Sequence, residues 1–315
     1  MRKRIIIYGI GKEFKTQRNY LESQFQIVGV SDLRKKDVNN FIEPKDIIKY
    51  NFDYIYITSL KFFDEIKMQL IGLGIAKEKI ISVKDVFGDF RNSQIRHEWV
   101  KNKLSQIEKG KVLLDAGAGE MRYKPYCKHL KYIAQDFGQY IPSEAAGLHP
   151  DAWDTSIVDI VSDIINIPIE DKYVDVVLCT EVFEHLKDPM LALKEFSRII
   201  KPGGTLILTA PFCCLTHMAP YFYYNGFSEF WYKEYLGQFD FQIVELTKNG
   251  NYFKFLCQEL FRVSDMANRY CMEELELEEI ETLCDTIKIL THLSEKDCGS
   301  AETLCFGYML EAKKV

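Results

Sequence analysis

The sequence lacks several features that would place it in common classes of protein. It has nine cysteines but no paired Cys-X-X-Cys motif, so neither a disulfide framework nor a zinc site is predicted, and we expect reduced thiols in the cytoplasm. It has no long hydrophobic run, because the apolar stretch at Ile5–Tyr8 is too short for a signal peptide or a membrane span. Low-complexity tracts are also missing.

An excess of positive charge is missing as well. The formal net charge is −6, and lysine and arginine are scattered along the chain. This pattern argues against nucleic acid as a partner, because a nucleic-acid-binding domain needs a basic patch. A length of 315 residues with 47% hydrophobic residues suggests two domains, or one enlarged domain, with substantial cores.

The most informative segment is a glycine turn that follows an apolar strand. Val112–Leu114 read as a buried strand that ends at Asp115, and the chain then passes through Gly117 and Gly119. Glycine allows a ligand to approach the backbone closely, and we expect a helix after the turn with its free N–H groups facing that ligand. The arrangement is typical of a site for an adenine-bearing cofactor at the first strand of a doubly wound sheet.

Further strands follow, and acidic residues stand near their ends. A second strand within 132–140 carries Asp136, and Asp163 follows a third strand. Residues 174–179 form a fourth strand, residues 188–200 a helix that Lys-Pro-Gly-Gly (201–204) should end, and residues 205–210 a fifth strand.

With these motifs in this order, residues 112–212 resemble the class I S-adenosylmethionine-dependent methyltransferases of the small-molecule branch. The resemblance implies an α/β fold with a doubly wound, seven-stranded sheet, and S-adenosyl-L-methionine as cofactor. It implies that Asp136 binds the ribose and that Asp163 faces the adenine. The full set of implied cofactor residues is Asp115, Ala116, Gly117, Gly119, Asp136, Phe137, Asp163, Ile164, Thr180 and Glu181.

The segment after the fifth strand carries the candidates for catalysis and acceptor binding. His217 is the predicted general base, because it follows strand five at the edge where ligands collect. Tyr221, Tyr224 and His185 are predicted to contact the acceptor. A structural histidine, a hydrophobic cover made by the tyrosines and a helix-cap role for His185 remain alternatives. No metal ligands are predicted.

The first 88 residues read as a separate Rossmann-like α/β domain. Its strands lie within 4–14, 25–37, 52–60 and 78–85 and alternate with helices, which predicts a parallel sheet. It resembles the small nucleotide- or nucleotide-sugar-binding domains of sugar-modifying enzymes. A purely structural or oligomerising role is the alternative. We expect a linker helix at 89–109 and the methyltransferase domain at 110–315.

The predicted function is O-methylation of a small polar acceptor by S-adenosylmethionine. The acceptor expected from the resemblance is a nucleotide sugar or phosphorylated sugar used in a bacterial surface glycan such as capsule or lipopolysaccharide. One alternative is a nicotinamide-dependent oxidoreductase that uses Gly9, Gly11 and Asp32, although Phe14 replaces the third glycine of that fingerprint. The other is a non-catalytic nucleotide-sugar-binding protein. No membrane partner is expected, and the oligomeric state stays open.

Overall fold

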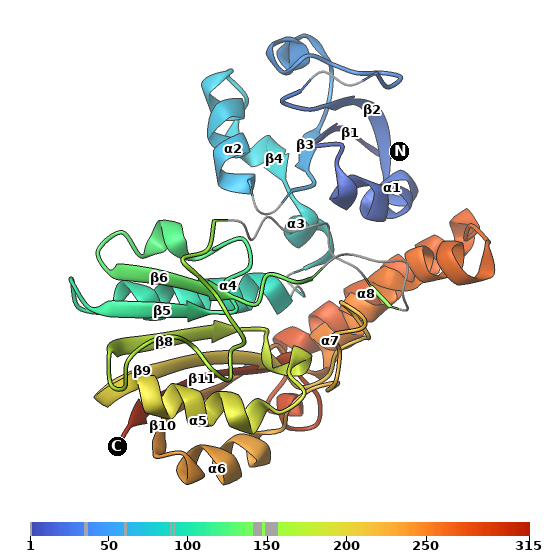
Figure 1. Cartoon of the computed structure of the whole chain (residues 1–315). Coiled ribbons are helices and arrows are strands. Elements are labelled where there is room, and N and C mark those ends of the chain that lie inside the picture. The colour runs from blue at the N-terminus through green and yellow to red at the C-terminus, as the bar shows by residue number, and fades with distance from the viewer. Residues whose placement is uncertain are drawn as a thin grey trace. The chain divides into compact units, whose positions relative to one another are not determined.

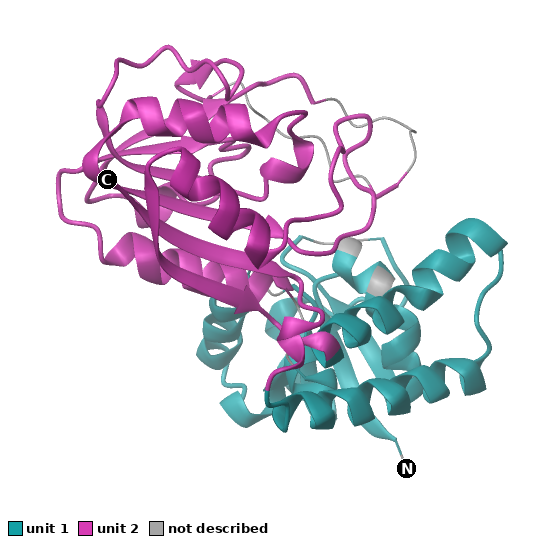
Figure 2. Ribbon diagram, turned by 90° about the horizontal axis from the view of Figure 1, so that it is seen from below, with its two compact units in different colours: residues 1–90, 253–298 teal, residues 91–252, 299–315 magenta. Residues whose placement is uncertain are grey.

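The computed structural model describes residues 2–34, 37–59, 62–88, 90, 92–140, 147–148 and 157–315. The chain divides into two compact units (Figure 2). The first unit consists of residues 1–90 and 253–298, and the second consists of residues 91–252 and 299–315. Each unit has its own sheet and its own hydrophobic core.

The first unit is built on a parallel sheet in the order β2-β1-β3-β4 (Figure 1). Its strands are β1 (Lys3–Tyr8), β2 (Phe25–Ser31), β3 (Tyr54–Ile57) and β4 (Ile80–Ile81). Its helices are α1 (Lys12–Gln24), α2 (Phe63–Gly72), α3 (Val83–Phe87), α7 (Tyr252–Met266) and α8 (Leu277–Glu295), with short 3-10 helices at Pro44–Lys49 and Lys77–Lys79 and a π-helical turn at Ala267–Cys271. The alternation of strands and helices that the sequence predicts for residues 1–88 is therefore present.

The position of α7 and α8 differs from the sequence-based domain boundaries. Residues 110–315 are predicted to form one domain, but residues 253–298 belong to the first unit. The reason is hydrophobic packing: Phe261 of α7 stacks on Tyr20 of α1 with ring centroids 4.5 Å apart, and the Tyr20 hydroxyl donates to the Leu260 carbonyl. Ile287 of α8 is fully buried in the same core.

The second unit contains a seven-stranded sheet in the order β10-β11-β9-β8-β5-β6-β7. Strands β5 to β9 pair in parallel, whereas β11 pairs antiparallel with both of its neighbours. The strands are β5 (Val112–Ala116), β6 (Lys131–Asp136), β7 (Ile160–Val161), β8 (Val174–Thr180), β9 (Ile200–Pro211), β10 (Phe241–Asn249) and β11 (Gly307–Lys314). The predicted doubly wound sheet is thus confirmed. Strand β9 begins five residues before the predicted range 205–210, because residues 201–204 form a bulge in the pairing of β8 with β9.

Helices cover both faces of this sheet. Successive side chains of a strand point to opposite faces, so Val177 and Cys179 of β8 face one core and Val176 and Leu178 face the other. The first face is covered by α5 (Pro189–Ile199) and α6 (Glu229–Gln238), and the second by α4 (Asn92–Ser105). Residues 92–105 are therefore part of the second unit and not a separate linker.

One expected helix is not formed. The glycine turn after β5 is followed by turns and a 3-10 helix at Lys124–Tyr126, and an α-helix is not described between Gly119 and β6. Met121 has a left-handed backbone (φ 53°), which an α-helix cannot contain, and Pro125 removes a backbone donor. In the described part of the chain, no helix is both long and apolar enough to cross a membrane.

Candidate active site

A cavity of about 510 Å³ lies at the carboxyl ends of β5, β6, β7 and β8. The chain continues from β5 to β6 and β7 on one side and returns to β8 on the other side, so the cavity lies where the strand order reverses. Ligands of open α/β sheets bind at such a point. Its lining residues are Gly117, Gln135, Asp136, Phe137, Gln139, Val161, Ser162, Asp163, Ile164, Ile165, Glu181, Val182, His185, Leu186, Lys187, Asp188, Leu191, Met218, Tyr221 and Tyr223.

Asp136 is the last residue of β6 and is held in place by the glycine turn. Its two carboxylate oxygens accept hydrogen bonds from the Gly119 and Gly138 N–H groups, each at 2.9 Å. Each oxygen keeps a further lone pair. The two backbone N–H groups thus fix the orientation of the carboxylate, which lines the cavity. It can accept further hydrogen bonds from a diol such as a ribose.

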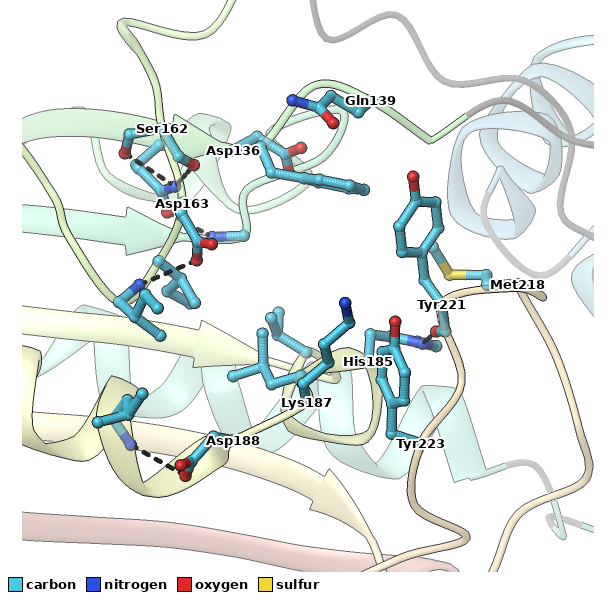
Figure 3. A pocket seen from close by; sticks show the side chains of 18 of the residues that line it. Asp136, Gln139, Ser162, Asp163, His185, Lys187, Asp188, Met218, Tyr221 and Tyr223 are labelled. Carbon is cyan, nitrogen blue, oxygen red and sulfur yellow. Dashed lines mark hydrogen bonds between the residues drawn. The ribbon is translucent and has the colours of Figure 1, made fainter.

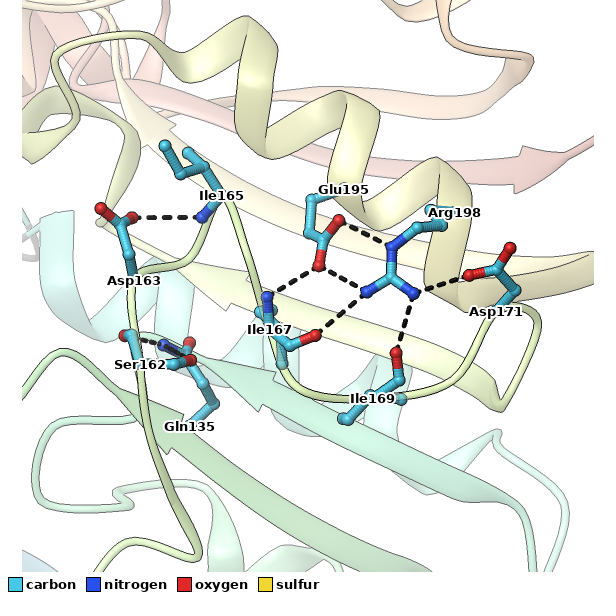
Figure 4. A network of polar contacts seen from close by, with 9 residues as sticks. All are labelled: Gln135, Ser162, Asp163, Ile165, Ile167, Ile169, Asp171, Glu195 and Arg198. Atoms are coloured by element: carbon cyan, nitrogen blue, oxygen red, sulfur yellow. Dashed lines mark hydrogen bonds and ion pairs between the residues drawn. The ribbon is translucent and has the colours of Figure 1, made fainter.

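Asp163 lies beside Asp136 on the same wall of the cavity (Figure 3). One of its oxygens accepts a hydrogen bond from the Ile165 N–H at 3.2 Å, which fixes a turn at the end of β7. The loop that follows is tied to α5 by Arg198, which donates to the main-chain carbonyls of Ile167 and Ile169 (Figure 4). The loop that follows Asp163 is therefore held by a partly exposed network around Arg198.

The first part of the glycine turn has a structural role that the sequence did not indicate. Asp115 is buried and accepts a hydrogen bond from the Tyr132 hydroxyl. Burial raises the pKa of Asp115 to about 7. The hydrogen bond from Tyr132 acts to lower this pKa, and the negative charge of the neighbouring Asp136 acts to raise it. Gly117 has a φ of +75°, and a Cβ at this position would lie 2.5 Å from a methyl group of Val182. Only glycine fits this turn without strain.

Glu181 also lines the cavity and directly follows β8. Its carboxylate pairs with Arg96 of α4 at 2.9 Å and accepts a hydrogen bond from the Thr209 hydroxyl at 3.0 Å. Burial raises the pKa of Glu181, which the Arg96 charge opposes. Sequence reasoning missed Arg96, because α4 carries many charged residues and nothing in its spacing marks the one that reaches the site.

A cluster of one carboxylate and two imidazoles lies next to Glu181. Glu184 is buried, and the Nε2 atoms of His185 and His217 each lie 3.7 Å from its Oε1 atom. Burial lowers the pKa of His185. Burial also acts to lower the pKa of His217, but the Glu184 carboxylate and the Leu215 carbonyl outweigh it, so that this pKa is raised.

Two tyrosines and His185 face the acidic wall across the cavity (Figure 3). The Tyr221 ring contacts Phe137 edge-on, with centroids 5.2 Å apart. Asp136, Asp163, Glu181 and Asp188 line the cavity together with a single lysine, Lys187, among the described residues. This surplus of carboxylates favours a cationic ligand.

The structure brings most of the sequence-predicted site residues to one place. Those that line the cavity are Gly117, Asp136, Phe137, Asp163, Ile164, Glu181, His185 and Tyr221. Those outside the described lining are Asp115, Ala116, Gly119, Thr180, His217 and Tyr224. Sequence reasoning missed Lys187, Asp188 and Met218, which lie in loops or at the start of a helix, where no strand end marks them.

Comparison with known proteins agrees with this geometry. Residues 114–208 match the family model "Methyltransferase domain". Residues 114–208 are a methyltransferase domain. The chain is 29% identical over 119 residues to a Mycolicibacterium smegmatis protein named "Probable S-adenosylmethionine-dependent methyltransferase", covering 37% of this chain and 44% of the relative. The matched segment and the order of the seven-stranded sheet agree with the methyltransferase fold expected from the sequence.

Two further relatives share the same part of the chain. The malonyl-[acyl-carrier protein] O-methyltransferase of Yersinia pestis is 31% identical over 111 residues (34% of this chain, 39% of the relative). The ubiquinone biosynthesis O-methyltransferase of Coxiella burnetii is 24% identical over 155 residues (45% and 65%). The chain spans less than half the length of the first curated relatives that it matches. A solved methyltransferase from Archaeoglobus fulgidus aligns with a TM-score of 0.44, 15% identity and coverage of 74% and 97%.

The first unit contains the other candidate site. Residues 1–81 match a family model described as "C2185-like, N-terminal". The Asp32 carboxylate accepts hydrogen bonds from the backbone N–H groups of Ile10 and Arg34, so it closes the Gly9 turn. This use of Asp32 is structural, and it gives no support to the oxidoreductase alternative.

Proposed function

We propose that this protein transfers the methyl group of S-adenosylmethionine to an oxygen atom of a small polar acceptor. The observation that supports the proposal is the cavity itself, which has two faces of different chemistry. Asp136 and Asp163 offer acceptors for a ribose and an adenine amino group, whereas His185, Tyr221 and Tyr223 face them from the opposite wall. A cofactor on the acidic wall would direct its sulfonium methyl group toward the second wall.

The reaction is an in-line displacement in which a carbon–oxygen bond forms as the carbon–sulfur bond breaks. The sulfonium charge disappears, and the acceptor hydroxyl loses its proton. Such a reaction depends mainly on the alignment of the two reactants and on the electrostatics around the disappearing charge. We assign activation of the acceptor hydroxyl to His217, whose imidazole lies beside the buried Glu184 carboxylate.

We infer that the acceptor is a nucleotide sugar or a phosphorylated sugar of a surface glycan. Two of the relatives are named as O-methyltransferases, which supports oxygen as the methylated atom. Tyr221 and Tyr223 offer flat surfaces on which a sugar ring or base can stack, and Lys187 offers a positive charge to a phosphate.

The test combines a binding measurement with a turnover screen. Calorimetry should show binding of S-adenosylmethionine and S-adenosylhomocysteine, and Asp136→Ala should weaken it by at least about tenfold, since one charge-assisted hydrogen bond contributes about 1.5–3 kcal/mol. Asp188→Asn, which changes a cavity carboxylate that caps α5, is the matched control. Release of S-adenosylhomocysteine is then measured with nucleotide sugars, phosphorylated sugars, tRNA, protein and lipid. Turnover confined to the last three acceptors would contradict the proposed substrate class.

A further inference from the structure

We propose that Glu184, His185 and His217 bind a divalent transition-metal ion of the Zn²⁺ type, which activates the acceptor hydroxyl. This inference rests on the proposed function and specifies how His217 acts: as a ligand of the ion. The candidate ligand atoms, one from each residue, all lie within 4.8 Å of one another. Two imidazoles and one carboxylate are a ligand set that catalytic zinc sites use.

The first argument is the unsatisfied charge of Glu184. Its side chain is 1% exposed, and its Oε2 atom has no hydrogen-bond partner among the described residues. A buried carboxylate is costly unless it is paired or binds a metal. At 3.7 Å, neither imidazole is close enough to Oε1 for a direct hydrogen bond. The imidazoles therefore do not satisfy the carboxylate by direct contact.

The second argument is the orientation of both imidazoles. The Nδ1 atom of His185 lies against the Tyr221 carbonyl, and the Nδ1 atom of His217 lies 2.9 Å from the Leu215 carbonyl. A carbonyl oxygen can only accept, so each Nδ1 carries a proton, and each ring in its neutral form presents the Nε2 lone pair. Metal-binding histidines are oriented in this way, with the second nitrogen donating to a carbonyl or carboxylate.

The third argument is the spacing. Zinc binds nitrogen and oxygen ligands at about 2.0–2.2 Å, so the ligand atoms of a tetrahedral site lie about 3.4 Å apart. The two Nε2 to Oε1 distances of 3.7 Å are within a few tenths of an ångström of this value. Since all three ligand atoms lie within 4.8 Å of one another, no pair has to close by more than about 1.4 Å.

The site is connected to the proposed chemistry through His185, which lines the cavity together with Met218 and Tyr221. Three protein ligands leave a coordination position open for the acceptor oxygen. Coordination lowers the pKa of a bound hydroxyl, so its proton passes to solvent before methyl transfer. The resulting alkoxide then attacks the methyl carbon, the carbon–oxygen bond forms, and the sulfonium leaves as a neutral thioether. No electrons are gained or lost at the ion.

The experiment uses the full chain, freed of metal with a chelator and titrated with Zn²⁺ by calorimetry. We expect one bound ion and a loss of Zn²⁺ affinity of more than about 100-fold in Glu184→Gln and in His217→Asn, since loss of an outer-shell partner alone typically costs 10–100-fold. His292→Asn is the matched control, because His292 is exposed and lies outside the cluster. His217 is 26% exposed at its side chain, so its variant should fold even if the buried Glu184 variant does not.

Two measurements distinguish this site from zinc binding elsewhere on the chain. The Co²⁺-loaded protein should show no thiolate charge-transfer band, and such a band would overturn the proposal because the nine cysteines would then hold the ion. Zn²⁺ binding that both cluster variants retain would overturn it as well. S-adenosylmethionine binding is measured in the same metal-free samples. Failure to bind the cofactor contradicts the proposed function, whereas failure to bind Zn²⁺ with normal cofactor binding contradicts the metal site alone.

Discussion

Replacement of Asp115 by asparagine should change how the stability of the second unit depends on pH. Burial raises the pKa of Asp115 from its ordinary 3.8 to about 7. At this carboxyl group the folded state therefore binds more protons than the unfolded state between these two values, so the contribution of Asp115 to stability falls as the pH rises from about 4 to about 7. This difference in pKa corresponds to a change in the free energy of unfolding on the order of 4 kcal/mol across that pH range.

Asparagine keeps an oxygen that can accept the Tyr132 hydrogen bond, but it cannot ionise. The stability of Asp115→Asn relative to the wild type should therefore increase across this pH range by up to the same amount and stay constant above it. The assay is urea unfolding at a series of pH values. Trp99, Trp153 and Trp231 are the only tryptophans of the sequence and all belong to the second unit, so fluorescence reports on that unit.

A suitable control is Asp175→Asn, for which no change in relative stability is expected between pH 4 and pH 7. Burial acts to raise the pKa of Asp175, but the Val112 N–H and the Lys201 ammonium group outweigh it, so that this pKa is lowered. The wild-type protein should gain stability over the Asp175 variant only as the pH rises from the lowered pKa to the ordinary value of 3.8, so the difference stays constant between pH 4 and pH 7. If the difference between wild type and Asp115→Asn were the same at every pH, Asp115 would titrate normally and the reasoning would be refuted.

Two further changes test the walls of the cavity. Gly117→Ala should destabilise the protein by at least about 1–2 kcal/mol, since an L-residue is strained at positive φ and its Cβ meets Val182. In urea unfolding, the additional change Val182→Ala should recover only the part of this cost that is due to the clash. Arg198→Met should lower the free energy of unfolding by about 1.5–3 kcal/mol and weaken cofactor binding, because two carbonyls of the loop at 162–171 lose their hydrogen-bond donor. The control Arg262→Met breaks an ion pair within one helix and should lower the free energy of unfolding by less than about 1 kcal/mol. Equal costs in these two arginine variants would contradict the role given to the network.

The sequence predicts the central strands of the second unit well, where they are short runs of apolar residues. Val174–Thr180 is a clear example, because it is apolar on both faces and is buried under helices on both sides. The helix pattern of residues 253–298 is equally clear, but an apolar helix face does not specify which sheet it will cover. The assignment of α7 and α8 to a domain therefore could not come from periodicity.

The candidate site was most directly predictable where a residue ends a strand or directly follows one. Asp136 and Glu181 fall in this class, because the carboxyl ends of parallel strands share one edge of the sheet. The meeting of His185 with His217 depends on the path of two separate loops, which no local pattern encodes. The same holds for Arg96, whose partner Glu181 is distant in the sequence.

The exchange of segments between the two units constrains how the protein can be made and divided. The first unit is complete only when residues 253–298 are available, and the sheet of the second unit is complete only when β11 inserts between β9 and β10. During synthesis, neither unit can finish folding before the ribosome has passed residue 298, so a nascent chain keeps both cores partly open for most of its translation. A fragment that ends at residue 90 would leave Phe87 and Phe90 without the helices that bury them. Separate expression of the units therefore requires a circular permutation or a short linker in place of residues 253–298, and not a simple cut.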